Sequence, residues 1–124
     1  AGRAMGWFRS GERFDEEIRR RSALAFLSDD LPTDAVLSVH PLSALGDAAY
    51  ERAFTASLDH TVWFHRPMRP SEWHLHDVTC HTFTGGRGLT VGAVFTAEGL
   101  HVATVAQEVL LRDTRALFDP TKGS

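Results

Sequence analysis

One polar residue in the 124-residue chain stands out because it falls where an apolar residue is expected. Gln107 lies in the run Leu100–Arg112, and strand alternation would place it on one face with Val105 and Val109. A buried amide is costly unless its oxygen and nitrogen find hydrogen-bond partners. Gln107 is therefore either a structural glutamine with buried partners or a group that orients a polar ligand or a water molecule.

Two histidines, His74 and His76, raise the possibility of a metal site, with His81 a few residues later. Alternation would put both side chains on the same face of a strand, where two imidazoles could bind one ion. A cupin-like site would also need a glutamate soon afterwards, and none occurs before Glu98. We therefore expect no metal and no cofactor.

The first part of the scaffold that must position these residues is mainly helical. Ala4–Arg9 is typical of a short strand closed by Ser10-Gly11. Phe14–Ser28 predicts the main helix, and its second half is apolar all round, which indicates burial on most sides. Pro32 is expected to end this helix. Thr33–Val39 and Ala48–Phe54 are compatible with either short helices or loop.

From Ser57 onward the pattern changes to antiparallel strands. They are expected at Ser57–Arg66, Trp73–Thr84, Leu89–Thr96 and Leu100–Arg112, and Gly99 can supply the positive φ of the last hairpin. One buried helix followed by long strands predicts an α+β fold in which the sheet wraps the helix. Other α+β folds share this order, so the pattern does not single one out.

Composition sets limits on the class of protein. The length and the hydrophobic share of 43% predict one globular domain over residues 1–124. The basic run Arg19-Arg20-Arg21 directly follows Asp15, Glu16 and Glu17, an order that suits a helix better than a nucleic-acid surface. We expect no nucleic-acid partner.

Two further features bear on where the chain works. The sequence has no stretch of about 18 apolar residues, so no membrane span is expected. Its one cysteine, Cys80, excludes an internal disulfide and favours a reducing compartment. The predicted location is cytoplasmic.

Five blocks in order resemble the acyl-CoA thioesterase II family. The run 57–67, SLDHTVWFHRP, resembles the signature DHxxWFHRP of that family. Glu72-Trp73, Gly86–Leu89 and the VAQE block Val105–Glu108 follow it, and Ala25–Asp29 (AFLSD) precedes it. The similarity spans roughly residues 7–112 and matches the C-terminal hot-dog domain of the family.

This resemblance implies a fold, a reaction and a site. The family has two hot-dog domains in one chain and hydrolyses acyl-CoA, and its catalytic Asp, Thr and Gln fall here on Asp29, Ser57 and Gln107. Ser57 departs from the usual Thr but keeps the hydroxyl. Asp30 stands beside Asp29, and the preceding Ser28 favours Asp29 as the base. An aspartate can take a proton from water as general base while the other two residues orient that water.

The alternatives come from two other classes. Hot-dog hydratases carry a D-x-N-P-x-H motif, whereas Asp59 and His65 lie six residues apart with no Asn-Pro between them. A non-catalytic hot-dog module would only dimerise or bind acyl chains. In every case a lone hot-dog leaves a sheet edge and an apolar face uncovered, so we expect a homo-oligomer or an N-terminal hot-dog partner.

Overall fold

A computed structural model describes residues 2–13, 15–28 and 31–114. In chain order its elements are β1 (Arg3–Phe8), α1 (Glu17–Leu27), α2 (Leu31–Val39), the 3₁₀ helix η1 (Pro41–Ala48), α3 (Ala49–Arg52), β2 (Ala53–Ser57), β3 (Thr61–Phe64), β4 (His74–Thr84), β5 (Arg87–Thr96) and β6 (His101–Asp113). Helices therefore fill the first half of the chain, and most strands follow them.

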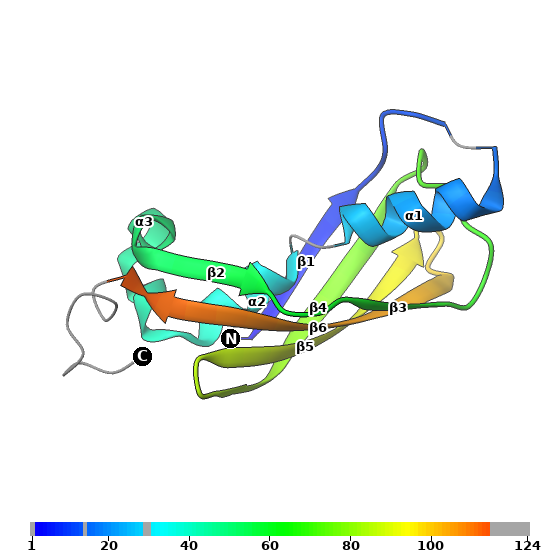
Figure 1. Cartoon of the computed structure of the whole chain (residues 1–124). Coiled ribbons are helices and arrows are strands. Elements are labelled where there is room, and N and C mark those ends of the chain that lie inside the picture. Colours follow the sequence, from blue (N-terminus) through cyan, green and yellow to red (C-terminus); the bar gives the residue numbers. More distant parts are fainter. Residues whose placement is uncertain (1, 14, 29–30, 115–124) are drawn as a thin grey trace.

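All the strands belong to one antiparallel sheet (Figure 1). Its order is β1-β4-β5-β6-β2, and β3 also pairs with β6. The long strands β4, β5 and β6 form a meander, and Gly99 adopts the expected positive φ of 90° in the β5–β6 turn. The sheet edges are β1 on one side and the pair β2 and β3 on the other.

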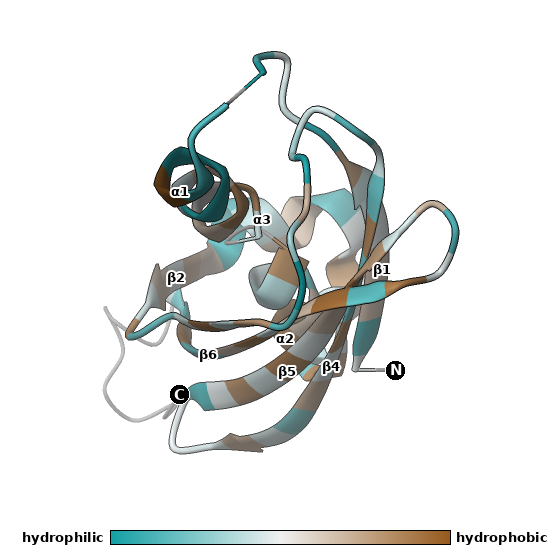
Figure 2. Ribbon diagram, turned by 90° about the vertical axis from the view of Figure 1, so that its right-hand side faces the viewer, coloured by the Kyte–Doolittle hydropathy of each residue, from teal (hydrophilic) through white to brown (hydrophobic). Residues whose placement is uncertain are grey.

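The helix that the sheet wraps is α2 (Figure 2). Its side chains Pro32, Ala35, Val36 and Leu37 are buried, and it contacts β1, β4, β5 and β6. Gly88 of β5 permits this close approach, because a Cβ there would lie 2.6 Å from a Val36 methyl group. The curved antiparallel sheet around one helix confirms the predicted α+β hot-dog fold.

The prediction that Phe14–Ser28 forms the buried central helix was wrong. Helix α1 begins at Glu17, and among its described side chains Leu24 alone is buried. Phe14 lies outside the described residues. The apolar second half of α1 contributes an edge to the core, whereas the shorter α2 covers the sheet. Pro32 does not separate helix from loop but stands in the first turn of α2, where its missing N–H costs no hydrogen bond.

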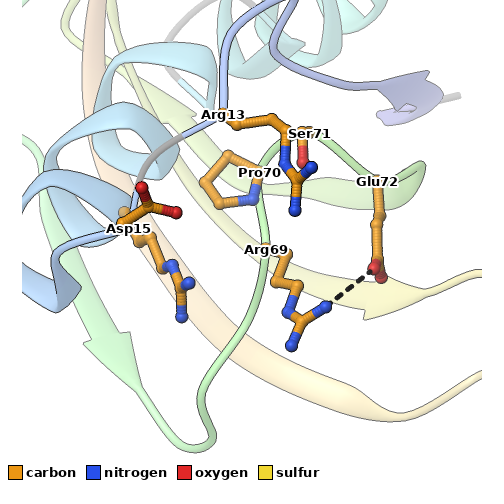
Figure 3. A pocket seen from close by; sticks show the side chains of 7 residues that line it. Arg13, Asp15, Arg69, Pro70, Ser71 and Glu72 are labelled. Carbon is orange, nitrogen blue, oxygen red and sulfur yellow. Dashed lines mark ion pairs between the residues drawn. The ribbon is translucent and has the colours of Figure 1, made fainter.

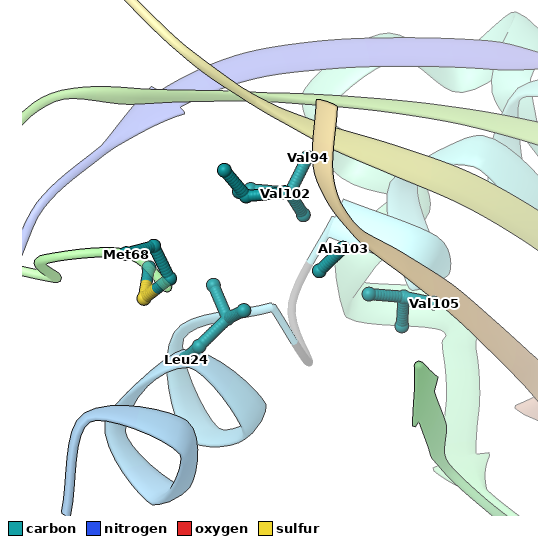
Figure 4. Close-up of a cluster of buried hydrophobic side chains, with 6 residues drawn as sticks. All are labelled: Leu24, Met68, Val94, Val102, Ala103 and Val105. Carbon is teal, nitrogen blue, oxygen red and sulfur yellow. The ribbon is translucent and has the colours of Figure 1, made fainter. Parts of the chain in front are cut away.

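The buried residues form two clusters on the inner face of the sheet. The first joins Leu24 of α1 and Met68 to strand residues Val94, Val102, Ala103 and Val105 (Figure 4). The second joins Val36, Leu37, Leu42 and Ala49 to Val109 and Leu111 of β6. Gln107 lies on β6 between these two clusters.

The strand expected at Ser57–Arg66 is divided into two. β2 begins earlier, at Ala53, and ends at Ser57, and β3 resumes at Thr61. Both pair with β6, so the break is local. The uncertain segment Ala48–Phe54 is the short helix α3 followed by the start of β2, and Thr33–Val39 is the body of α2.

Candidate active site

The break between β2 and β3 lies directly opposite Gln107. Ser57 pairs with Val109 and Thr61 pairs with Ala106, so three residues on one side face two on the other. Such a bulge locally interrupts the ladder and redirects side chains. It brings the end of β2 against the middle of β6.

Gln107 and Ser57, 50 residues apart, are hydrogen-bonded: the amide nitrogen of Gln107 donates to the hydroxyl of Ser57. Gln107 is fully buried, whereas Ser57 is exposed. The amide oxygen of Gln107 is buried and has no hydrogen-bond partner among the described residues. Its backbone oxygen accepts a bond of 2.9 Å from the Thr90 hydroxyl on β5. The hydrogen-bonded pair thus connects an exposed hydroxyl, that of Ser57, with a buried acceptor, the amide oxygen of Gln107.

Asp59 fixes the bulge. One of its carboxylate oxygens accepts a hydrogen bond of 2.8 Å from the backbone N–H of Glu108, the residue after Gln107. The N–H of Leu58 donates to the Glu108 carbonyl at 2.9 Å. These bonds hold the segment between β2 and β3 at one position along β6.

His60 ties the end of α1 to the same place. Its Nε2 lies 3.2 Å from the hydroxyl of Ser28, which is fully buried and also donates to the carbonyl of Ala25 at 3.2 Å. Ser28 is the last described residue before position 29. Asp29 and Asp30 lie outside the described residues, so the predicted convergence of Asp29 with Ser57 and Gln107 stays a prediction.

Three supporting residues were missed as site residues in the sequence: Ser28, Asp59 and His60. All three stand inside the blocks AFLSD (25–29) and SLDHTVWFHRP (57–67) that carry the family resemblance. The spacing of these residues did not indicate the bond from Asp59 to β6 or the contact between Ser28 and His60. Those contacts join segments up to 49 residues apart in the chain. The motif blocks were the available signal.

His74 and His76 lie on one face of β4, as alternation predicts, and both are buried. Nδ1 of His74 lies 2.8 Å from the Glu72 carbonyl, and the ring stacks on Phe8. Burial, and then the nearby His60, lower the pKa of His76 to about 4. The part of the chain that the structure describes holds no cluster of three metal-ligating side chains.

The residues of the hydratase alternative have separate partners. Asp59 is bonded to the Glu108 N–H, as described above. Nε2 of His65 lies 2.8 Å from the Thr104 hydroxyl, and its ring packs against His101. No described contact joins Asp59 to His65.

A pocket of about 170 Å³ adjoins the junction between α1 and α2. Leu27 and Leu31, the residues flanking that junction, line it together with Gly6, Trp7, Phe8, Asp34 and His76. Its wall is largely apolar. An acyl chain is the kind of ligand that such a wall accommodates.

Comparison with known proteins gives a consistent result. Residues 1–111 match the family model described as the acyl-CoA thioesterase C-terminal domain. Acyl-CoA thioesterase 2 of Haemophilus influenzae is 33% identical over 114 residues, which cover 86% of this chain and 36% of that protein. Acyl-coenzyme A thioesterase 8 of Mus musculus is 40% identical over 63 residues, covering 51% of this chain and 20% of that protein. The chain thus spans about a third or less of these curated relatives.

Solved structures of thioesterases superpose on this chain. Acyl-CoA thioesterase II TesB2 from Mycobacterium marinum superposes with a TM-score of 0.77 at 37% identity, covering 91% of this chain and 42% of that one. A DHNA-CoA thioesterase from Staphylococcus aureus superposes with a TM-score of 0.65 at 10% identity over 98% of this chain and 85% of that one, which shows a shared fold. Among the described residues, no helix combines the length and apolarity that a bilayer span requires.

Proposed function

Because the chain belongs to the family of acyl-CoA thioesterase C-terminal domains, we propose that it hydrolyses acyl-CoA thioesters to free fatty acid and CoA. The observation that carries the proposal is the buried Gln107, bonded to Ser57 at the bulge and bearing an amide oxygen without a described partner. Leaving such an acceptor unbonded in the fold is costly, and a bound water would satisfy it.

In the proposed mechanism, Asp29 acts as the general base. The water oxygen attacks the thioester carbonyl carbon while Asp29 takes a proton from that water. Ser57 and Gln107 hold the water in line with the carbonyl. The carbon–sulfur bond of the tetrahedral intermediate then breaks, the CoA thiolate leaves, and Asp29 returns the proton to its sulfur. The step needs no metal and no redox partner.

The supporting contacts favour a preorganised site. Asp59 and His60 link the bulge to β6 and to Ser28, so Ser57, Gln107 and the end of α1 belong to one hydrogen-bonded unit. Groups fixed in this way lose little conformational entropy when a substrate binds. The apolar pocket beside Leu27 and Leu31 is suited to the acyl chain.

We also propose that residues 1–124 form one hot-dog domain that acts beside a second one, either a copy of itself or an N-terminal hot-dog. The match to about a third of a longer relative favours this arrangement. It also keeps open a non-catalytic role in which this domain binds acyl chains for a partner. A cytoplasmic location stays a prediction from the single cysteine.

The test is CoA release from acyl-CoA substrates of increasing chain length. General base catalysis contributes about 10²- to 10⁴-fold, so Asp29→Asn should lower kcat by that order with KM nearly unchanged. Asp30→Asn is the matched control and should keep its activity. Ser57→Thr should be tolerated, Ser57→Ala should not, and chelators should have no effect.

Two results would contradict this assignment. Activity that survives Asp29→Asn but is lost in Asp30→Asn would move the base by one residue. Activity abolished by a chelator would restore the metal hypothesis for His74 and His76. If the chain alone releases no CoA, the same variants in a longer chain with the N-terminal half separate a dependent domain from an inactive one.

A further inference from the structure

A pocket at the N-terminal end of α1 gathers three arginines from three separate segments (Figure 3). Arg13 precedes the helix, Arg20 lies in its first turns, and Arg69 comes from the segment between β3 and β4. The volume is about 310 Å³, and the other lining residues are Asp15, Pro70, Ser71 and Glu72. The proposed hydrolysis uses none of these side chains.

The walls of this pocket are tied together. The N–H of Ser10 donates to the Pro70 carbonyl at 2.6 Å, which joins the segment after β1 to the segment before β4. A turn closes the second segment, since the N–H of Glu72 donates to the Arg69 carbonyl at 2.9 Å. Pro70 itself is buried. Arg69 therefore extends from a backbone that is held in place.

The charge balance of the pocket favours an anion. Three guanidinium groups face two carboxylates, which leaves one net positive charge. Arg69 and Glu72 lie 4.0 Å apart, and both are about two-thirds exposed, so this ion pair is weak and open to competition. Guanidinium groups bind phosphate oxygens in a planar, two-point arrangement. The positive end of the α1 dipole adds to the attraction.

The structure also explains the run Arg19-Arg20-Arg21. Successive residues of a helix with 3.6 residues per turn point in different directions. Arg20 is one of the residues that line the pocket. Arg21, which is not among them, bonds to Glu17 at 3.1 Å and lies over the Phe64 ring. The three arginines thus do not form one stripe of positive charge, and a small phosphorylated ligand fits the arrangement better than a nucleic-acid strand.

We propose that this pocket binds the phosphate groups of CoA, which rests on the proposed thioesterase function and adds the place where its substrate is anchored. Arg20 precedes Ser28 by eight residues, about 12 Å along a helix axis. The pantetheine arm of CoA separates its phosphates from its sulfur by a long, flexible chain. An arm lying along α1 would carry the thioester from the arginines towards the Ser57–Gln107 pair.

The experiment measures binding without turnover. CoA, dephospho-CoA and pantetheine are titrated calorimetrically into the wild-type chain and into Arg13→Gln/Arg20→Gln. Hydrogen bonds to charged groups are the strong class, so the double variant should bind CoA at least about tenfold more weakly, with pantetheine binding unchanged. Glu72→Gln, which removes a competing carboxylate, should bind CoA more tightly.

Arg21→Gln is the matched control, because it removes the same charge from the adjacent residue outside the pocket, and CoA binding should be unchanged. Equal loss in Arg21→Gln, equal affinity of wild type and double variant, or no binding of CoA to the wild-type chain would each overturn the proposal. If CoA binding depends on the arginines but no acyl-CoA is hydrolysed, the phosphate site is supported and the proposed thioesterase reaction is contradicted. If acyl-CoA is hydrolysed equally well with and without the arginines, the proposed reaction is kept and the proposed phosphate site is wrong.

Discussion

His76 is a neutral imidazole enclosed in the inner face of the sheet. It is 2% exposed, its ring packs edge-on against Phe8, and its Nε2 is buried without a partner among the described residues. Burial lowers its pKa to about 4, well below the value of about 6.5 in an unfolded chain. The folded state therefore resists taking up a proton that the unfolded state accepts.

The sign of the resulting pH dependence follows from this difference. Between pH 6.5 and 4 the unfolded chain binds more protons, so stability falls as the pH falls through that window. The contribution of His76 to this loss between pH 7 and pH 4 is expected to be about 3 kcal/mol. Urea unfolding at both pH values should show a correspondingly smaller loss in His76→Phe, each variant being compared with itself at pH 7.

His81→Gln provides the control, because His81 is exposed on the same strand. It should lose as much stability on acidification as the wild type does. If His76→Phe loses as much stability as the wild type, the buried imidazole does not control acid stability. The hydrogen-bonded pair Ser57 and Gln107 is a second feature at the scale of residues. Neither side chain titrates, so the pair is expected to act through its geometry and not through a change of charge.

At the scale of elements, the contact between α2 and β5 positions the central helix. A Cβ on Gly88 would lie 2.6 and 2.7 Å from the two Val36 methyl groups, closer than carbon atoms pack. Gly88→Ala should therefore destabilise the protein by about 1–3 kcal/mol, the usual cost of overpacking. Chemical denaturation measures this change.

A compensating variant distinguishes this clash from a general effect of removing glycine. Val36→Ala removes both methyl groups, so Gly88→Ala/Val36→Ala should recover part of the loss, and the two changes should not add. Gly11→Ala is the control, because nothing lies within 4 Å of its Cβ position. If the losses of unfolding free energy in Gly88→Ala and Val36→Ala simply add in the double variant, the contact between Gly88 and Val36 does not position α2.

At the scale of the whole molecule, large apolar side chains stand exposed on the outer face of the sheet. Met5 and Trp7 on β1 and Leu89 and Val91 on β5 are large, apolar and exposed on the face opposite the core. Among the described residues, no strand pairs with the outer side of the edges β1 and β2. Exposed apolar side chains on a sheet face, together with open strand edges, are typical of a surface that associates.

We therefore predict association in solution. Light scattering at micromolar concentration should give a mass above the 13.7 kDa of one chain, and Trp7→Glu/Val91→Glu should lower it towards that value. Glu51→Gln, an exposed change on α3 away from this face, should leave the mass unchanged. A stable wild-type monomer would contradict the prediction, and binding only to a separate N-terminal hot-dog would identify that domain as the partner.

The sequence by itself determined the long strands of the meander and the motifs that identify the family. The alternation over Leu100–Arg112 predicted β6 and the burial of Gln107 among Ala103, Val105, Val109 and Leu111, because side chains in a strand alternate with a period of two. Gly99 predicted the hairpin, since a turn there requires positive φ. The blocks AFLSD, DHTVWFHRP and VAQE identified the family, which comparison with known proteins confirms.

Only the tertiary structure decided which helix the sheet wraps. An apolar second half made Phe14–Ser28 the candidate, but burial depends on which helix lies over the concave face, and Gly88 admits α2 there. The break at 58–60 was also invisible, because a bulge is set by the partner strand and by the bonds of Asp59 and His60. The Ser57–Gln107 bond and the meeting of Arg13, Arg20 and Arg69 join segments far apart in the chain, and sequence periodicity describes only neighbours.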